Sequence, residues 1–163
     1  MELHFRCYRP TDLAVIKRLT IEGFEGVSID RNIEDQFGLI SNHDWRWRKV
    51  RHIDFDVERD ADGVFVAELD GQVVGYITTF RDHDAGIGLI PNLAVDAQQR
   101  GRGIGRKLIE YALDNFREAG LTHAKIETLA QNDVGQVLYP SLGFREVARQ
   151  IHYCMALGPA KDG

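Results

Sequence analysis

A run of glycines and arginines joins an apolar stretch to an amphipathic helix in "NLAVDAQQRGRGIGRKLIEYAL", residues 92–113. Gly101, Gly103 and Gly105 alternate there with Arg100, Arg102 and Arg106. Because glycine leaves the backbone uncovered, amide N–H groups at the start of the helix can approach a ligand closely. These first amides lack partners within the helix, and the positive end of the helix dipole stabilises an anion beside them. Arginines add charge-assisted hydrogen bonds, so the run predicts a phosphate-binding loop between a strand and a helix.

The spacing of this loop excludes two common nucleotide-binding motifs. A P-loop requires GxxxxGK followed by Ser or Thr, and the sequence contains no such run. A dinucleotide-binding turn requires GxGxxG, and with Gly101 and Gly103 in place the last position holds Arg106. Taken alone, the run is also compatible with a flexible glycine-rich turn that binds nothing.

Hydrophobic periodicity predicts a single mixed α/β domain over residues 1–163. Asp70 and Gly71 between two apolar runs give a strong hairpin signal, and Gly88 and Pro91 predict a bulge or a splayed edge in the following strand. The expected strands cover 3–9, 63–69, 72–80, 87–95 and 124–130, with one or two closing strands in 144–157. The expected helices cover 11–24, 103–119 and 133–142, the last cut or kinked by Pro140. Residues 25–62 look partly helical, "ERDADG" reads as a loop, and the tail from 158 should fray.

Charge and composition narrow the classes of function. The formal net charge of −5 disfavours non-specific nucleic-acid binding. No stretch approaches the roughly 18 to 20 apolar residues of a membrane span. The start "MELHFRCYRP" lacks the apolar core of a signal peptide, so we expect a cytoplasmic protein without a membrane partner. Cys7 and Cys154 lie in expected strands without metal-binding spacing, which predicts buried, reduced thiols and no metal site.

Charge is distributed unevenly along the chain. Between Glu25 and Asp62 there are ten carboxylates against six Lys or Arg, whereas four cations crowd into residues 100–107. An anionic ligand suits the second region, and the first is either a site for a cationic ligand or a solvated acidic surface. Trp45 and Trp47 fall on different helical faces, which favours packing over a substrate cage.

Two blocks of the sequence together resemble the GNAT superfamily of N-acetyltransferases. Its acetyl-CoA signature reads Arg or Gln, two residues, Gly, any residue, then Gly or Ala. Residues 100–105 match it, and residues 98–103 match it a second time. The first register fits better, because it places Ile104 and Leu108 in the helix core. Downstream, "QNDVGQVLYPSLGF" resembles the family's second block, with Asn132 seven residues before Tyr139.

The resemblance covers residues 63–157 and, less fully, 1–24, and it implies both a fold and a cofactor site. The fold is an α/β GNAT fold: a twisted, mostly antiparallel mixed sheet of about six or seven strands, flanked by about four helices, with splayed central strands. The cofactor is acetyl-CoA, whose pantetheine arm lies between the splayed strands. The implied cofactor-binding residues are Leu93, Ala94, Val95, Arg100, Gly101, Arg102, Gly103, Ile104, Gly105, Arg106 and Asn132.

The implied reaction is transfer of the acetyl group of acetyl-CoA to a primary amine by direct attack in a ternary complex. The amine must lose a proton and the leaving thiolate gains one, and Tyr139 falls on the family's acid position. The alternative for Tyr139 is a core aromatic, and Pro140 directly after it departs from the commonest family pattern. The strand over 87–95 lacks the carboxylate that members often use as base. The candidates for the base that stay open are Glu22, Asp30, a water chain, His43, His52 and His83.

The acceptor is not specified by the sequence, and two other functions stay open. The acceptor is a small-molecule amine or a peptide or protein amine, and the acidic 25–62 segment favours a cationic one. One alternative function is a non-catalytic acyl-CoA-binding or regulatory domain of the same fold, and the other is an acyltransferase that uses another acyl-CoA. The resemblance also allows a homodimer formed through the closing strands.

Overall fold

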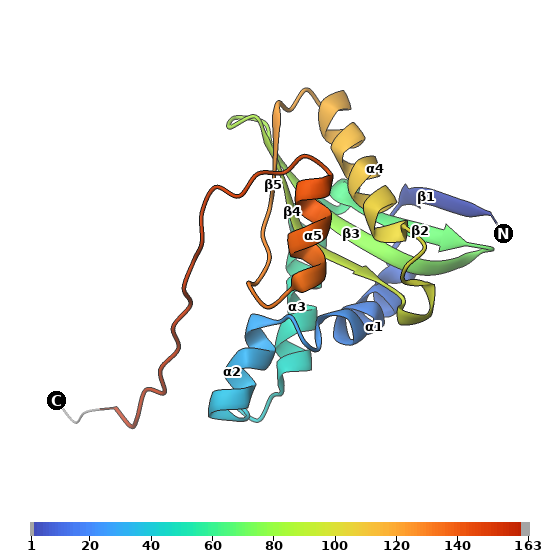
Figure 1. Cartoon of the computed structure of the whole chain (residues 1–163). Helices are drawn as coiled ribbons and strands as arrows, with labels where there is room; N and C mark the ends of the chain where they lie inside the picture. The colour runs from blue at the N-terminus through green and yellow to red at the C-terminus, as the bar shows by residue number, and fades with distance from the viewer. Residues whose placement is uncertain (1, 161–163) are drawn as a thin grey trace.

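A sheet with the strand order β1-β2-β3-β4-β5 forms the centre of the computed structural model, which describes residues 2–160 (Figure 1). The first four strands pair antiparallel, and β5 pairs with β4 in parallel. The strands are β1 (Leu3–Cys7), β2 (Val64–Leu69), β3 (Gln72–Asp82), β4 (Ile87–Val95) and β5 (His123–Ile126). This mixed α/β sheet confirms the predicted fold class.

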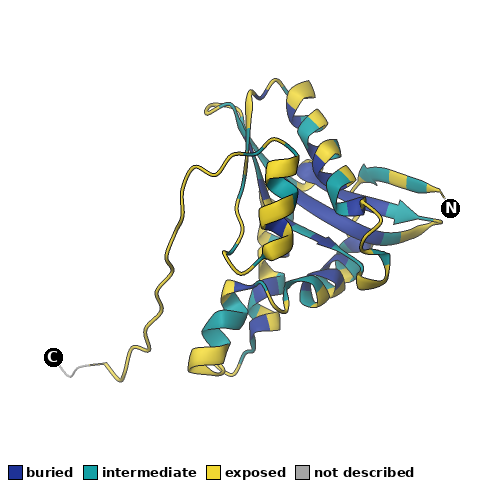
Figure 2. Ribbon diagram, in the orientation of Figure 1, coloured by how far each residue is buried: buried dark blue, intermediate teal, exposed yellow. Residues whose placement is uncertain are grey.

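Helices cover both faces of the sheet. They are α1 (Leu13–Phe24), α2 (Ile29–Phe37), α3 (Trp45–Asp60), α4 (Ile104–Glu118) and α5 (Asp133–Ser141), with short 3-10 turns at Pro10–Asp12, Ala61–Gly63 and Ala97–Gln99. Alternate residues of β2 serve two separate cores: Phe65 packs with the apolar stripe of α4, and Val66 packs with α1 and α3. The central strands are therefore buried on both sides, whereas the outer ends of the helices are exposed (Figure 2).

Local backbone rules explain the turn between β2 and β3. Asp70 has φ +49° and Gly71 has φ +82°, so both central residues lie in the left-handed region that a tight hairpin requires. The predicted hairpin is confirmed.

The predicted irregularity in β4 is also confirmed. Thr78 of β3 pairs with Asn92, and Phe80 pairs with Leu89, so two residues of β4 oppose one residue of β3. This bulge falls at Pro91, which has no N–H to donate to the ladder. Pairing between β4 and β5 ends at Ile90 and Ile126, so the two strands part just beyond the bulge.

The prediction of closing strands is wrong for the single chain. Residues 145–160, which we name the C-terminal arm, contain no strand, are fully exposed and run away from the body of the molecule (Figures 1 and 2). The sheet of the described residues accordingly has five strands rather than six or seven, and β5 is shorter than the expected 124–130. An extended segment forms a β-strand only when it pairs with a neighbouring strand, and the alternation of its side chains does not show whether such a neighbour is present.

Two smaller expectations are also corrected. Cys7 and Cys154 are both exposed, because Cys7 points outward from the edge strand β1 and Cys154 lies in the C-terminal arm. Part of "ERDADG" is helical rather than a loop, since α3 continues to Asp60. The rest of 25–62 forms α2 and most of α3, in agreement with its partly helical pattern.

Candidate active site

The gap between β4 and β5 exposes backbone groups of β4. The N–H of Asn92 donates to Thr78 Oγ1 of β3 at 3.0 Å, and the N–H of Asp96 donates to Val74 O at 2.8 Å. Because backbone groups alternate along a strand, the N–H groups of Leu93 and Val95 point the other way, into the gap. The N–H of Ala94 points towards β3, so only two of the three predicted β4 residues offer backbone donors to a ligand there.

The glycine loop leads directly from this strand to α4. Gly101 has φ +78° and Gly103, the N-cap of α4, has φ +76°, a conformation that favours glycine. A Cβ at either position would meet no atom within 4 Å, so the space above the loop is open. Within residues 2–160, no backbone amide from Arg100 to Arg106 donates to a protein acceptor. The loop therefore fits the diphosphate of coenzyme A, because it presents several unpaired donors at the positive end of α4.

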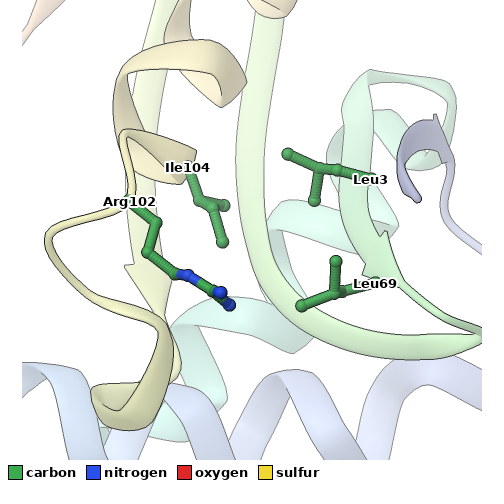
Figure 3. A pocket seen from close by; sticks show the side chains of 4 residues that line it. All are labelled: Leu3, Leu69, Arg102 and Ile104. Carbon is green, nitrogen blue, oxygen red and sulfur yellow. The ribbon is translucent and has the colours of Figure 1, made fainter. Parts of the chain in front are cut away.

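The three arginines of the loop point in different directions. Arg100 Nε donates to the carbonyl of Val95 at 3.4 Å, so this guanidinium stays beside the end of β4. Arg106 donates to Ser141 Oγ at 2.6 Å and thereby bridges α4 and α5. Arg102 instead reaches into a hollow of about 200 Å³ that also has Leu3, Leu69 and Ile104 in its walls (Figure 3). Since the hollow lies beside β1 and β2 rather than at the gap, only the backbone of Arg102 is placed for the diphosphate.

Asn132 serves first as a helix cap. Its Oδ1 accepts from the N–H of Gly135 at 3.1 Å, and its Nδ2 donates to Thr128 Oγ1 at 2.8 Å. A Cβ at Gly135 would lie 2.7 Å from Asn132 Nδ2 and 3.0 Å from the Tyr139 ring, so glycine lets the cap close. One N–H of the Asn132 amide is left for a ligand.

Tyr139 lies in the last turns of α5 with a mostly buried ring. The ring meets Phe144 edge-on at a centroid distance of 6.3 Å, and it packs against the core cluster under α4. Burial raises the pKa of the Tyr139 phenol, so the group keeps its proton at neutral pH. Pro140 follows inside the same helix without displacing the ring from this core.

A buried polar network that no sequence pattern predicted joins α3 to β4. Lys49 Nζ donates to Asn92 Oδ1 at 2.7 Å, and Asn92 Nδ2 donates to Asp56 Oδ2 at 2.7 Å. Thr78 Oγ1 donates to the same Asp56 oxygen at 2.7 Å. Burial lowers the pKa of Lys49 to about 8, although Asp30 and Asp56 act in the opposite direction. The network fixes Asn92, the residue directly before Leu93.

The candidate bases are mostly engaged in other contacts. Glu22 accepts from Arg18 at 3.0 Å, and Asp30 pairs with Arg48 and His52. Burial and the nearby charge of Lys49 lower the pKa of His52, which therefore favours its neutral form. His43 stacks on Trp47 at a centroid distance of 3.5 Å, and His83 is exposed in the β3–β4 turn. The packing prediction for the two tryptophans is confirmed for Trp45, which is fully buried, whereas Trp47 is 41% exposed.

A carboxylate that we did not predict borders the gap. Glu127 directly follows the last paired residue of β5, and its side chain is 71% exposed beside Lys125. The prediction considered the strand before the glycine loop and then Glu22 and Asp30, but not the strand that follows the loop, whereas a gap between two strands has two edges. "KIET" at the end of the following strand was the available signal.

Part of the acidic charge of the 25–62 segment is paired with lysines and arginines. Asp54 pairs with Lys17, Asp60 with Arg81 and Asp35 with Arg31. The segment also reaches across to the loop after β5, because Gln131 Nε2 donates to the carbonyl of Gly26 at 2.7 Å and Asn32 Nδ2 donates to Gln131 Oε1 at 2.9 Å. The segment therefore packs against the loop that follows β5.

Neither a metal centre nor a membrane span emerges from the part of the chain that the structure describes. No three of its His, Cys, Asp and Glu side chains are grouped so that they could hold a metal ion. None of its helices has the length and the apolar composition to cross a membrane.

Curated relatives of this chain are acetyltransferases. Mycothiol acetyltransferase of Thermomonospora curvata is 34% identical over 94 residues, which is 58% of this chain and 31% of that protein. The ribosomal protein bS18 alanine N-acetyltransferase of Escherichia coli K12 is 35% identical over 72 residues, which is 44% of this chain and 46% of that protein. The matched part spans less than half the length of either relative.

A solved structure shows the fold, and a family model shows the family of this chain. The PaiA N-acetyltransferase of Thermoplasma acidophilum, solved in complex with coenzyme A, superposes with a TM-score of 0.70 at 18% identity, covering 89% of this chain and 91% of that one. At that identity the likeness shows the fold alone. The model of the Acetyltransferase (GNAT) family matches residues 28–144, a span that includes β4, the glycine loop and α5. The chain therefore belongs to the Acetyltransferase (GNAT) family.

Proposed function

We propose that this protein transfers the acetyl group of acetyl-CoA to a primary amine. The observation that carries the proposal is the loop of unpaired amides from Arg100 to Arg106, placed directly beyond the strand edge that β5 leaves open. A diphosphate at the loop and an extended arm along β4 match the two parts of coenzyme A. The PaiA relative of the same fold was solved with coenzyme A, which supports this cofactor.

The residues of β4 would place the reacting group. Bound acetyl-CoA supplies a thioester whose carbonyl carbon is open to attack by an amine. The N–H groups of Leu93 and Val95 point into the gap, so they can hold the pantetheine amide and polarise the thioester carbonyl. The Lys49 network fixes Asn92 and so limits the movement of Leu93.

Proton transfer assigns roles to two further residues. Tyr139 would donate a proton to the leaving sulfur, since its buried phenol is protonated at neutral pH. The attacking amine must be neutral and must lose a proton, and Glu127 is a carboxylate at the edge of the gap that water can reach. We propose Glu127, directly or through water, ahead of Glu22 and Asp30, because it follows the last paired residue of β5 at the edge of the gap and its side chain is 71% exposed, while its carboxylate also pairs with Lys125 at 2.9 Å.

The proteins that resemble this chain differ in the acceptor they acetylate. The Escherichia coli relative acts on an alanine of a ribosomal protein, and a structural neighbour is an aminoglycoside acetyltransferase, AAC(6')-Iy. We propose a peptide or protein amine as the first class to test, because one curated relative is named as an N-alpha-acetyltransferase and another as an alanine N-acetyltransferase of ribosomal protein bS18. Small-molecule amines are the second class.

Assembly and location also belong to this proposal. We propose that the chain works as a homodimer, since residues 145–160, within the segment expected to close its sheet, are exposed and form no strand in the single chain. A cytoplasmic location stays a prediction from the sequence.

The test is a thiol-release assay with acetyl-CoA against a panel of N-terminal peptides, polyamines and aminoglycosides. Acetyl-CoA should also raise the unfolding temperature, because a ligand at about 100 times its Kd adds about 2.7 kcal/mol to the stability of the native state. Longer acyl-CoA donors distinguish acetyl transfer from another acyl transfer. Binding without thiol release on any amine would favour a regulatory domain, and no thermal shift would remove the cofactor assignment.

A further inference from the structure

Four side chains at intervals of four residues form a row along one side of α3. They are His43, just before the helix, and Trp47, Arg51 and Phe55 within it. Residues four apart are neighbours on a helix surface. The rings of His43 and Trp47 stack almost in parallel, with their centroids 3.5 Å apart. The Arg51 guanidinium lies 4.6 Å from the centroid of Trp47 and 5.6 Å from that of Phe55, so cation–π contacts continue the row, which we name the α3 row.

The α3 row lies on the surface of the chain. Trp47 is 41% exposed and Phe55 is 53% exposed, and neither belongs to the two apolar cores of the described residues. The turn before α3 adds Leu39 and Ile40, which are 61% and 40% exposed. This turn lies at the end of the molecule away from α4 (Figure 1). Aromatic side chains and arginine are enriched at protein interfaces, so an exposed surface of this composition marks an interaction site.

A tight turn fixes the first member of the row. Ile40 and His43 exchange two backbone hydrogen bonds, at 3.2 and 3.0 Å. Between them, Ser41 has φ +51° and Asn42 has φ +61°, in the left-handed region that is unfavourable for residues other than glycine. The turn holds the His43 ring against Trp47 before any partner binds. A surface that is already ordered loses less conformational entropy on binding.

The charge of Arg51 is not neutralised within the part of the chain that the structure describes. The neighbouring cations are paired: Arg46 lies 3.5 Å from Asp44, and Arg48 lies 3.3 Å from Asp30. Arg51 forms neither an ion pair nor a hydrogen bond within residues 2–160, and its contacts are with the two aromatic rings. Its planar N–H groups are therefore available to a carboxylate, which a guanidinium binds through two parallel hydrogen bonds.

The charges around the row favour a peptide over a membrane surface or a nucleic acid. Those two ligands are held by clusters of several unpaired cations. The row offers the single guanidinium of Arg51, and Glu58, less than one turn beyond Phe55, adds an exposed negative charge at that end. One carboxylate flanked by apolar side chains matches this arrangement, because the carboxylate pairs with Arg51 while the apolar groups cover the rings.

We propose that the α3 row is a docking site for an acidic peptide segment of another protein. A carboxylate of the segment binds Arg51, and apolar side chains beside it pack on Trp47 and Phe55. From Trp47 to Phe55 the row measures about 12 Å along the helix, which about four extended residues span. The buried side chains of α3, Lys49 and Ile53, occupy the opposite side of the helix, so docking leaves the packing of α3 intact.

The first experiment finds and measures the peptide with the full chain. An array of short peptides with acetylated N-termini, in which acidic, basic and apolar positions are varied, is probed with the parent chain. The spots that bind should combine Asp or Glu with adjacent aromatic or aliphatic residues. The dissociation constant of the strongest of these peptides is then measured in solution from the fluorescence of a dye on the peptide.

Variants of the chain connect this binding to the row. Arg51→Gln and Phe55→Ala should each raise the dissociation constant at least about tenfold. The matched control, Arg117→Gln, removes the same charge from the opposite face of the sheet and should change the constant by less than about twofold. Arg51, Phe55 and Arg117 are all exposed, so none of the variants disturbs a core.

Three results would overturn the proposal. One is an array on which no acidic peptide binds, and another is binding that Arg51→Gln and Phe55→Ala leave unchanged. The third is flotation of the parent chain, but not of Arg51→Gln, with phosphatidylserine vesicles, which would assign the row to a membrane surface. Because the acetylated N-termini of the peptides cannot accept an acetyl group, docking does not depend on the proposed reaction. Failure of either the docking test or the thiol-release assay therefore leaves the other conclusion standing.

Discussion

At the scale of single residues, the phenol of Tyr139 carries the proton-donating step of the proposed reaction. Tyr139→Phe keeps the ring in its core but removes the proton, so turnover should fall about 10²- to 10⁴-fold while the affinity for acetyl-CoA changes little. Thiol release and calorimetry measure these two quantities separately. A parallel loss of affinity would mean that the ring only supports the fold.

The same residue predicts a pH dependence. Because burial raises the pKa of Tyr139, the protonated phenol persists above the ordinary tyrosine value of about 10. Its contribution to the rate should be lost only as the pH rises through that raised pKa. An alkaline limb in the kcat profile of the parent chain, absent from Tyr139→Phe, is the expected result.

Lys49 makes stability depend on pH in a direction that can be worked out. Its pKa is lowered to about 8 in the folded chain, whereas an unfolded lysine titrates near 10.4. Between these values the unfolded state binds the extra proton, so raising the pH should stabilise the fold. The gain is on the order of 3 kcal/mol when complete. The neighbouring titratable groups Asp30, Asp56 and His52 belong to the same site.

Urea titrations of the parent chain and Lys49→Met at several pH values test this expectation. Comparing the two chains cancels titration elsewhere in the molecule. The free energy of unfolding of the parent chain should rise relative to Lys49→Met between about pH 8 and pH 10. A constant difference would show that Lys49 keeps an ordinary pKa.

At the scale of elements, the glycine loop combines a conformational and a binding requirement. Gly103→Ala puts a Cβ at φ +76°, which costs about 1–2 kcal/mol for an L residue. It should lower stability by that amount and weaken acetyl-CoA binding, because the amides that follow are displaced. Gly26→Ala is the stability control, since it lies outside the left-handed region and its Cβ meets nothing within 4 Å. Equal unfolding curves for both variants would contradict the role of the loop.

Elements whose signals are local could be predicted from the sequence. The Asp70–Gly71 hairpin, the bulge before the gap and the glycine loop each depend on backbone preferences of adjacent residues, and each is present. The Lys49–Asn92–Asp56 network joins residues far apart in sequence, so no short pattern could show it. The exposure of Cys154 was missed for a similar reason. The arm could form a strand only beside the edge of another strand, and the local alternation of apolar residues does not show whether such an edge is available.

At the scale of the whole molecule, the parting of β4 and β5 predicts that the acyl donor and the amine bind in a fixed order. An extended acyl donor lying between these strands would itself form part of the surface on which an amine must settle. Without the bound donor, the amine site lacks the contacts that the donor supplies. We therefore expect sequential kinetics in which the acyl donor binds before the acceptor. Free coenzyme A should then compete with acetyl-CoA in product-inhibition measurements and should not compete with the amine. The gap between β4 and β5 would in this way determine the order in which the two substrates bind.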